Sequence, residues 1–321
     1  MNRCCATCAV LFIAAFTGTG VRAAPQADKA AGILAEARKA IGAKAIEHLS
    51  SLNVDASVKR DVGQMQLDST LEMLFQLPDK YVRSETLTRG PMTSTSTTGF
   101  NGDAPIQRFS SPPSQGGVMM FRMGGPGAPP PGPDGKPAEL TPEQKAAMSK
   151  AAVRSATVDV SRLMLGWFAM AFPSLDATYT YAGEAVSPDG KADVIDVKGA
   201  DGFAARLFID EQRHLPLMLT YTAPKPRIIT MSRGRGPGGA GRGEATASPD
   251  AIQKQAQQAA GQPPEMAEYT LYFDDWRSVD GLKFPYSIKQ AMAGTTMEDW
   301  TVTKVQINPT IDPKKFDAGG L

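Results

Sequence analysis

The sequence predicts an α+β fold, in which helices cover the concave face of one large, curved antiparallel sheet that forms an unclosed half-barrel. Segments of alternating apolar and polar residues follow one another, with turn signals rich in Gly, Pro and Asp between them, which is the pattern of antiparallel hairpins. These segments lie on both sides of an apolar helical segment, so either half alone would expose an apolar sheet face. About twelve strands of this length would curl instead of staying flat.

The clearest predicted element is a long strand over Gly63–Leu77. Its odd positions from Met65 to Phe75 are apolar except Ser69, and its even positions are polar except Leu74. Alternation with a period of two residues gives a strand one apolar and one polar face. The apolar face needs a long apolar partner, either other side chains or a ligand. Ser69, the polar residue on that face, marks a turn of the cavity wall or a ligand contact.

Residues 1–24 are predicted to be a signal peptide. Arg3 provides a positive start, Ala9–Phe16 an apolar core, and the small residues around Ala24 a cleavage site. The apolar run is shorter than the ~20 residues of a spanning helix. All three cysteines, at positions 4, 5 and 8, lie in this segment. We therefore expect a periplasmic or secreted mature chain, without thiols, disulfides or a transmembrane segment, that forms a single domain over residues 25–321.

Two helical regions are predicted. The first covers residues 27–49 and is interrupted at Gly42. The second begins at Thr141, where Thr-Pro-Glu-Gln provides an N-cap, a proline at the first helical position and a capping box. We expect it to run to Phe172, with a break near residues 155–159. Its last part, Leu163–Phe172, is apolar all round, which is typical of a buried helix, and we expect it to lie on the apolar face of the sheet.

The remaining strands are predicted from further alternating segments. These segments are residues 52–60, 80–88, 93–102, 178–186, 191–199, 202–210, 216–223, 268–279, 282–290 and 298–307. Pro285 lies at an outward position of its segment, which predicts an edge strand because proline cannot donate a ladder hydrogen bond. Two Pro/Gly-rich inserts, at about 111–140 and 224–265, interrupt the domain. The first contains the apolar island Met119–Met123, which either attaches the loop to the surface or forms a flexible flap.

Residues suited to catalysis, metal binding or nucleic-acid binding are scarce. The net charge of +1 argues against a nucleic-acid partner. His48 and His214 lack the ligand spacings of zinc sites, and no Gly-x-Ser-x-Gly elbow occurs. The adjacent carboxylates at 274–275 and 298–299 point to opposite faces of a strand, so neither pair forms a dyad, and both are interpreted as solvated. The sequence therefore predicts a protein that is not an enzyme and has no cofactor or metal.

Several phrases resemble a known family of exported bacterial proteins. They include GQMQLDSTLEMLFQLPDKYVRSE, LFIDEQRHLPLMLTYT, DDWRSVDGLKFPYSIKQ and VTKVQINPTIDPKKF. Together they are similar to the outer-membrane lipoprotein-sorting (LolA/LolB-like) superfamily, over residues 28–110 and 141–321 without the second insert. The resemblance implies an unclosed β-barrel whose mouth is covered by helices around a hydrophobic cavity. The inserts depart from the carrier pattern, and no residue here matches the arginine of the carrier cavity, so no site residue is carried over.

The apolar surface between sheet and helix is the remaining candidate site. The expected lining residues are Met65, Leu67, Leu71, Met73, Phe75, Trp167, Phe168, Phe172, Phe273, Phe284, Tyr286 and Ile288. A dry, filled core is one interpretation, and a gap filled by an acyl chain is the other. The first hypothesis is a periplasmic carrier of lipid or lipoprotein acyl chains. The alternative is a protein-interaction or envelope-stress sensing module whose inserts engage an envelope protein.

Overall fold

The computed structural model describes residues 23–62, 65–90, 92–111, 141–188, 190–226 and 264–317. The chain divides into two compact units. The first contains Met1–Pro112, Ser149–Thr222 and Glu268–Leu321, and the second contains Pro113–Met148 and Ala223–Ala267. Of the second unit, the described residues are 141–148, 223–226 and 264–267. The fold below is that of the first unit, and the single domain with two inserts stays a prediction.

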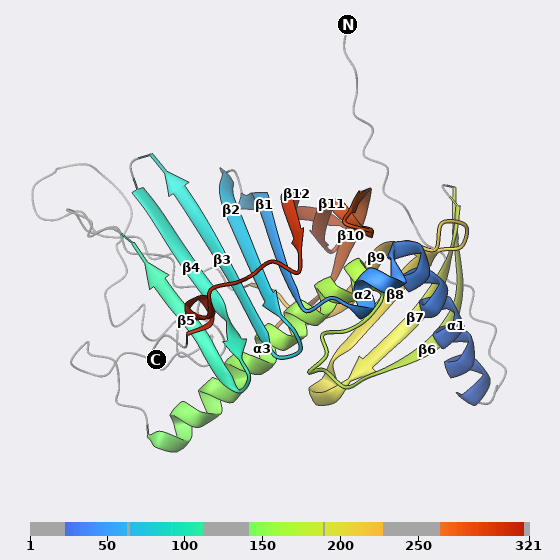
Figure 1. Ribbon diagram of the computed structural model, residues 1–321, viewed down its shortest axis with the longest axis horizontal. Helices are drawn as coiled ribbons and strands as arrows, with labels where there is room; N and C mark the ends of the chain where they lie inside the picture. Colours follow the sequence, from blue (N-terminus) through green and yellow to red (C-terminus); the bar gives the residue numbers. More distant parts are fainter. Residues whose placement is uncertain are drawn as a thin grey trace, which may run out of the picture. The chain divides into compact units, whose positions relative to one another are not determined.

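Twelve strands form one open antiparallel sheet in the order β5-β4-β3-β2-β1-β12-β11-β10-β9-β8-β7-β6 (Figure 1). The strands are β1 (Ser51–Val62), β2 (Met65–Gln76), β3 (Lys80–Arg89), β4 (Met92–Asn101), β5 (Ala104–Ser110), β6 (Ala177–Ser187), β7 (Gly190–Gly199), β8 (Ala204–Asp210), β9 (Pro216–Pro224), β10 (Met266–Val279), β11 (Leu282–Met292) and β12 (Thr295–Ile307). Because β5 and β6 are separate ends of this order, the sheet is not closed. The predicted fold class, an unclosed sheet with helices, is confirmed.

The long alternating strand is β2, and it pairs with β1 along its whole length, from Ser51 opposite Gln76 to Val62 opposite Met65. Apolar residues at the odd positions of β2 are buried as the alternation predicts: Leu71 and Phe75 are at most 2% exposed. Leu74, the exception in the pattern, is buried on the opposite face of the sheet. There it packs with Val82, Ile106 and Phe316, the last from a C-terminal 3-10 turn, η2 (Pro313–Phe316).

The helices are α1 (Ala23–Ile41), α2 (Ala43–Glu47) and α3 (Pro142–Phe168). Gly42 separates the first two, as predicted, with a φ of 134° that side chains rarely adopt. The capping box predicted at the start of α3 is present: the backbone N–H of Gln144 donates to Thr141 Oγ1, and the Thr141 N–H donates to Gln144 Oε1.

Two predictions about α3 are wrong. Residues 155–159 stay helical, because this stretch contains neither glycine nor proline and nothing interrupts the backbone ladder. The helix also ends at Phe168 instead of Phe172. Ala169 has a φ of 52° and donates its N–H to the Leu165 carbonyl, which closes the last turn and redirects the chain before Pro173.

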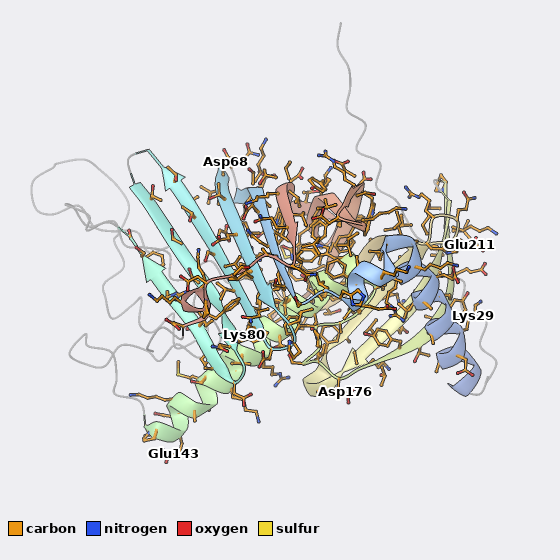
Figure 2. The ribbon with its side chains drawn as sticks, in the orientation of Figure 1. Lys29, Asp68, Lys80, Glu143, Asp176 and Glu211 are labelled. Atoms are coloured by element: carbon orange, nitrogen blue, oxygen red, sulfur yellow. The ribbon has the colours of Figure 1, made fainter. Side chains whose placement is uncertain are left out.

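Helices α1 and α3 cover the same face of the sheet, which we call the covered face. Lys29 of α1 is labelled in Figure 2. Its Nζ lies 3.7 Å from the ring centroid of Tyr181 on β6. The ring of Tyr221 on β9 lies under Arg162 of α3, with Cζ at 3.9 Å. The strand pairings show that Tyr181 and Tyr221 lie on the same face. Tyr181 is opposite Ile195, Ile195 is opposite Leu207, and Leu207 is opposite Leu219, which is two residues before Tyr221 on β9. The prediction that helices cover one face of the sheet therefore holds.

The prediction for Pro285 is wrong. Pro285 is buried, and its strand β11 lies inside the sheet between β10 and β12. The proline is tolerated because the register of β11 with β12 begins only at Ser287. Beside Pro285, the described pairing is with Trp276 of β10. Proline has no N–H to donate to a neighbouring strand, and at Pro285 no pairing with β12 is described. The proline is therefore compatible with a strand inside the sheet.

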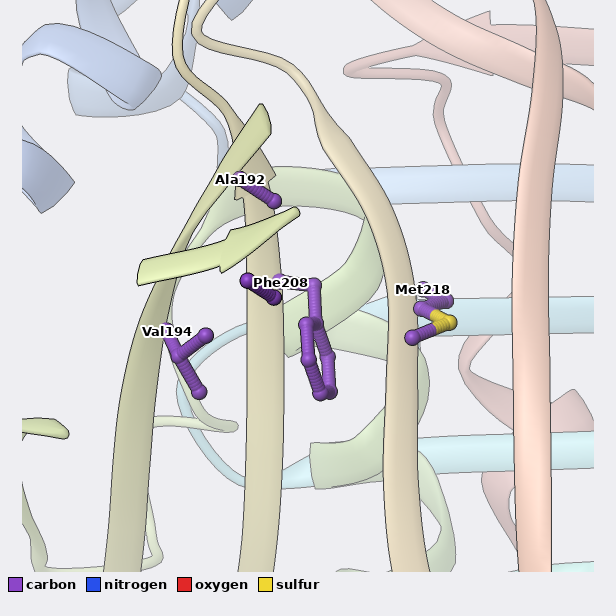
Figure 3. Packing of buried hydrophobic residues seen from close by; sticks show 5 residues of the cluster. Ala192, Val194, Phe208 and Met218 are labelled. Carbon is purple, nitrogen blue, oxygen red and sulfur yellow. The ribbon is translucent and has the colours of Figure 1, made fainter. Parts of the chain in front are cut away.

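The opposite face carries a second apolar cluster on the strands from β6 to β9. It contains Ala185, Ala192, Val194, Phe208 and Met218, each 4–8% exposed (Figure 3). Register places Val194 opposite Phe208 and Phe208 opposite Met218, one position out of step with the side chains that face the helices. Both faces of these strands therefore carry buried apolar side chains.

Candidate binding site on the covered face of the sheet

The structure brings most of the predicted lining residues together on the covered face. Nine of them are at most 3% exposed: Leu71, Met73, Phe75, Trp167, Phe168, Phe172, Phe273, Phe284 and Ile288. They come from β2, β10, β11, α3 and the chain just after α3. Phe172 lies beyond the helix end but still packs inward, with its ring 5.4 Å from that of Phe100 in an edge-on arrangement. That these residues line a ligand cavity stays a prediction.

The interior is filled by aromatic rings. Trp167 is at its centre, with ring centroids 4.8 Å from Phe284, 5.8 Å from Phe75 and 6.2 Å from Phe168. These are ordinary distances for packed aromatic pairs. Gly166 lets α3 approach closely, because a Cβ atom there would lie 1.9 Å from Phe273 Cζ. In the state described, the contact between α3 and the sheet is therefore dry and closed.

Three other predicted lining residues lie differently. The side chain of Met65 is outside the described residues, although its backbone pairs with Val62. Leu67 is half-buried towards the same end of the strand. Tyr286 is also half-buried, and the Arg277 guanidinium lies 4.4 Å from its ring centroid. Leu67 and Tyr286 therefore lie at the margin of the packed region.

Among the described residues, few polar interactions hold the end of α3 and the turn after it, where the Ala171 N–H donates to Tyr179 Oη at 3.1 Å. Arg38 of α1 donates from Nη1 to the carbonyl of Ala169 at 3.2 Å. The Phe172 N–H donates to Ser161 Oγ at 3.3 Å, within the buried turn itself. The indole Nε1 of Trp167 is fully buried and has no hydrogen-bond partner among the described residues. A buried donor without a partner costs roughly 1–3 kcal/mol, so the closed packing is not fully satisfied.

Beyond the apolar region, the covered face carries a charged cluster. We give this name to Arg60, Ser69, Arg83, Glu85, Glu298 and Trp300. Arg60 joins both acids, with Nε 2.7 Å from Glu298 Oε1 and Nη1 2.9 Å from Glu85 Oε1. Four strands contribute to it, namely β1, β2, β3 and β12. The side chains of Arg60, Glu85 and Glu298 are 15–27% exposed, so the cluster lies partly in solvent.

The other hydrogen bonds of the cluster orient its acids. Ser69 Oγ donates to Glu85 Oε1 at 2.8 Å, and Trp300 Nε1 donates to Glu298 Oε2 at 2.9 Å. Arg83 makes a longer contact of 3.4 Å to Glu85 Oε2, and its Cζ lies 5.0 Å from the Trp300 ring centroid. Among the described residues, Arg83 therefore makes one hydrogen bond with the five N–H donors of its guanidinium, whereas Arg60 makes two.

Electrostatics keep Glu85 ionised. Desolvation opposes ionisation, but the charges of Arg83 and Arg60 and the Ser69 hydrogen bond outweigh it and lower the pKa of Glu85. The pKa of Arg60 is raised: desolvation alone would lower it, and the charges of Glu298 and Glu85 more than compensate. A carboxylate held ionised by two guanidiniums is a poor general base. The cluster is thus suited to orienting a polar group and unsuited to proton transfer.

The sequence pointed to only part of this cluster. Ser69 was singled out as the polar residue on the apolar face, and it does contact a charged side chain. The sequence predicts a solvated turn or edge for Glu298, but register places it opposite Arg60 inside the sheet on the covered face, where its side chain is 15% exposed. Its neighbour Asp299 pairs with Lys59 on the other face, so the two carboxylates point apart as expected. The sequence signal that could have predicted the cluster is a polar residue at a position whose alternation places it on the apolar face of the strand.

Surface depressions lie elsewhere in the described part of the chain. One of about 610 Å³ is open and includes Lys44, His48 and Asp280. Another, of about 120 Å³, includes Lys59 and Asp299. Neither is lined by α3. Among the described residues, no three His, Cys, Asp or Glu side chains are placed to hold a metal ion. No described helix is long and apolar enough to cross a membrane.

Comparisons with known proteins give structural neighbours only. No protein-family model and no curated protein matches the sequence. A DUF1329 family protein from Desulfovibrio piger is 8% identical with a TM-score of 0.43, over 91% of this chain and 97% of that one. A LolA superfamily protein from Nitrosomonas europaea is 9% identical with a TM-score of 0.42, over 90% and 97%. A putative outer membrane lipoprotein-sorting protein domain from Vibrio parahaemolyticus is 8% identical with a TM-score of 0.43, over 91% and 97%.

The resemblance that the sequence predicts is therefore found again among solved structures. Identities of 8–9% and TM-scores below 0.5 carry no argument about ligand or activity. The function is argued below from the residues of this chain.

Proposed function

We propose that this protein is an exported, non-catalytic binding protein that holds a lipid or lipoprotein acyl chain between α3 and the covered face of the sheet. The observation that carries the proposal is the nature of the contact at the end of α3. It consists of apolar side chains with few polar interactions, and it leaves the Trp167 indole N–H unpartnered among the described residues. The closed packing is the ligand-free state in this proposal.

An acyl chain can replace the contacts of α3 with little loss. Rings and aliphatic side chains that leave the covered face expose apolar area, and methylenes of the ligand cover it again at about 0.8 kcal/mol each. Opening also frees Trp167 to find a partner for its indole N–H. The non-directional character of apolar contacts means that such an exchange needs no matched geometry. Reversible binding and release follow, because neither state is held by many directional bonds.

The charged cluster would orient the polar end of the ligand. Ligand sites are mostly apolar with a few polar groups that set direction. The cluster lies on the same face as the packed region, since Ser69 and Phe75 share one side of β2. Arg83, with its single long contact to Glu85, has N–H donors available for a headgroup oxygen. The ligand class that fits is therefore amphipathic, with one apolar chain and an oxygen-rich end.

Binding of a fluorescent fatty acid to the purified chain tests this proposal. We expect saturable binding that unlabelled fatty acid competes away, together with a change in the emission of Trp167. The emission is assigned in a variant that carries Trp276→Phe and Trp300→Phe, which leaves Trp167 as the remaining tryptophan of the three. Absence of saturable binding, together with absence of lipid extracted with the purified protein, would refute the proposal.

A second candidate function is favoured by the closed interior. If the interior never opens, the fold serves as an interaction or envelope-stress sensing module for an envelope protein, and the inserts are its contact elements. Deletion of residues 112–140 separates the two functions. Fatty-acid binding should survive this deletion if the chain is a carrier. Loss of partner binding, with no fatty-acid binding in either form, would instead support the module.

A further inference from the structure

Arg162 of α3 belongs to a second polar group on the covered face. Its Cζ lies 3.9 Å from the ring centroid of Tyr221. That ring stacks on Tyr269, with centroids 5.3 Å apart and planes 9° from parallel. Gln290 Nε2 donates a hydrogen bond to Tyr221 Oη at 2.7 Å. Because both tyrosines are 9% exposed, the Arg162 guanidinium rests on an aromatic surface that is itself held in place.

The hydrogen bonds of Arg162 leave part of its guanidinium unused. Its Nη1 donates to Asp159 Oδ1 at 2.9 Å, three residues earlier on the same helix. Its Nε is buried and has no hydrogen-bond partner among the described residues. The side chain is 13% exposed, so water reaches little of it. A buried donor without a partner is costly, and an acceptor brought by a ligand would remove that cost.

Asp159 is the acid on which both Arg162 and Arg83 of the charged cluster act. Desolvation raises the pKa of Asp159, and the charges of Arg162 and Arg83 oppose this rise. The Asp159 side chain is nevertheless 63% exposed, in contrast to that of Arg162. An exposed carboxylate in a pair of this kind is weakly held. It can therefore turn into water and leave its place beside the two guanidiniums.

Three guanidiniums and three carboxylates balance in this region, namely Arg60, Arg83, Arg162, Glu85, Glu298 and Asp159. Arg60 fixes two of the acids, at 2.9 Å from Glu85 and 2.7 Å from Glu298, and their side chains are 21% and 15% exposed. Asp159 is thus the most exposed of the three acids. When it turns away, one positive charge stays uncompensated between α3 and the sheet, which favours an incoming anion.

We propose that Arg83 and Arg162 bind the negatively charged head group of the acyl-chain ligand, a carboxylate or a phosphate, which replaces Asp159 as their counter-ion. The inference rests on the proposed function and specifies the ligand class for the same site. Guanidiniums bind both anions through directional, charge-assisted hydrogen bonds. One guanidinium comes from β3 and the other from α3, so the head group would join the sheet to the helix.

The head-group site adjoins the apolar contact. Arg83 is opposite Met73 of β2, and Arg162 is five residues before Trp167 on α3. Met73 and Trp167 are both fully buried in the apolar region that the acyl chain would enter. A ligand with its anion at the two guanidiniums can therefore place its first methylenes against apolar side chains, as an amphipathic ligand requires.

Three probes with the same acyl chain test the inference: oleoyl lysophosphatidic acid, oleic acid and monooleoylglycerol, which is uncharged. Equilibrium dialysis of the purified chain measures the affinity for each below its micelle concentration. Wild type should bind both charged probes at least about tenfold more tightly than the uncharged one. The ratio of the two charged affinities identifies the preferred anion.

Arg83→Gln and Arg162→Gln should each reduce the affinity for the charged probes about tenfold and leave monooleoylglycerol binding unchanged. The matched control is Arg206→Gln. Arg206 pairs with Asp196 at 2.7 Å, and it lies two residues before Phe208 on β8, on the face opposite the helices. This control should keep the wild-type preference. Circular dichroism shows that each variant is folded.

Asp159→Asn gives a readout of opposite sign at an exposed position, where folding is little affected. Removal of the competing carboxylate should tighten binding of both charged probes and leave monooleoylglycerol unchanged. Equal affinity of wild type for all three probes overturns the inference but leaves the proposed function intact. A preference that survives in both arginine variants, or weaker binding of the charged probes in Asp159→Asn, also overturns it. Binding of none of the probes refutes the proposed function and this inference together.

Discussion

Replacing Gly166 by alanine tests how closely α3 is packed on the sheet. An alanine Cβ at this position would lie 1.9 Å from Cζ and 2.3 Å from Cε2 of Phe273. Real Cβ contacts essentially never come below about 3.0 Å. Phe273 is 3% exposed, so its ring cannot move out into solvent without displacing neighbouring side chains. Either the ring or the helix must therefore shift.

The magnitude follows from two opposing terms. Alanine in a helix is favoured over glycine by about 1 kcal/mol. Insertion of a methyl group into a packed core costs typically about 1–3 kcal/mol. Gly32 of α1 provides the matched control, because a Cβ there meets nothing within 4 Å. Gly32→Ala should stabilise the protein by about 1 kcal/mol, and Gly166→Ala should be about 1–3 kcal/mol less stable than this control.

Urea unfolding of the two variants and the wild type measures these differences through the midpoint at constant slope. A double variant, Gly166→Ala with Phe273→Leu, should lose less stability than the sum of the single changes, since the shorter side chain leaves room for the methyl group. If Gly166→Ala is as stable as Gly32→Ala, the close packing of α3 on β10 is wrong. The account of a dry, closed interior would then fail with it.

Three further changes probe other parts of the fold. Glu85→Gln should destabilise the protein at neutral pH and weaken the dependence of its stability on acid pH. The pKa of Glu85 in the folded protein is lowered from 4.5. The carboxylate therefore stabilises the fold above its unfolded pKa, and this stabilisation is lost as the pH falls through the folded pKa. Urea unfolding over a pH series shows this, and parallel profiles would contradict it. Phe316→Ala should cost about 3 kcal/mol in the same assay, because it empties a fully buried site behind Leu74; a loss below about 1 kcal/mol would mean that η2 is not part of the core. Trp167→Phe removes the unpartnered indole N–H and should cost less than about 1.5 kcal/mol or stabilise; a larger loss in thermal unfolding would show that the N–H is satisfied.

Alternation in the sequence accounts for most of the sheet. Each alternating segment became a strand, because a period of two residues is compatible with a half-buried strand and with little else. Gly42 also separated α1 from α2 where the pattern indicated, since its φ of 134° excludes other residues. The end of α3 was harder to predict. Residues 169–172 are as apolar as the helix before them, and only the backbone of Ala169 shows that the helix has ended.

The charged cluster shows what a single sequence leaves open. Arg60 and Glu298 are 238 residues apart, and they meet because β1 and β12 pair in one particular register. Glu85 joins them from β3 through the register of β2. The alternating pattern of a single segment predicts a strand, but it does not predict which strands become neighbours. The strand order that brings these four segments together therefore could not be predicted from any one of them. Pro285 makes the same point, because its place inside the sheet depends on where the β11–β12 ladder begins.

The most direct test of the proposed function is the emission of Trp167 in the variant that keeps only this tryptophan, measured while a fatty acid is added. In the closed state Trp167 is fully buried among aromatic rings. Binding between α3 and the sheet must change those surroundings. The account predicts a saturable spectral change with one fatty acid per chain, and a tighter apparent affinity in Gly166→Ala, whose α3 is held less firmly. An unchanged Trp167 spectrum at fatty-acid concentrations that saturate binding elsewhere on the chain would contradict it.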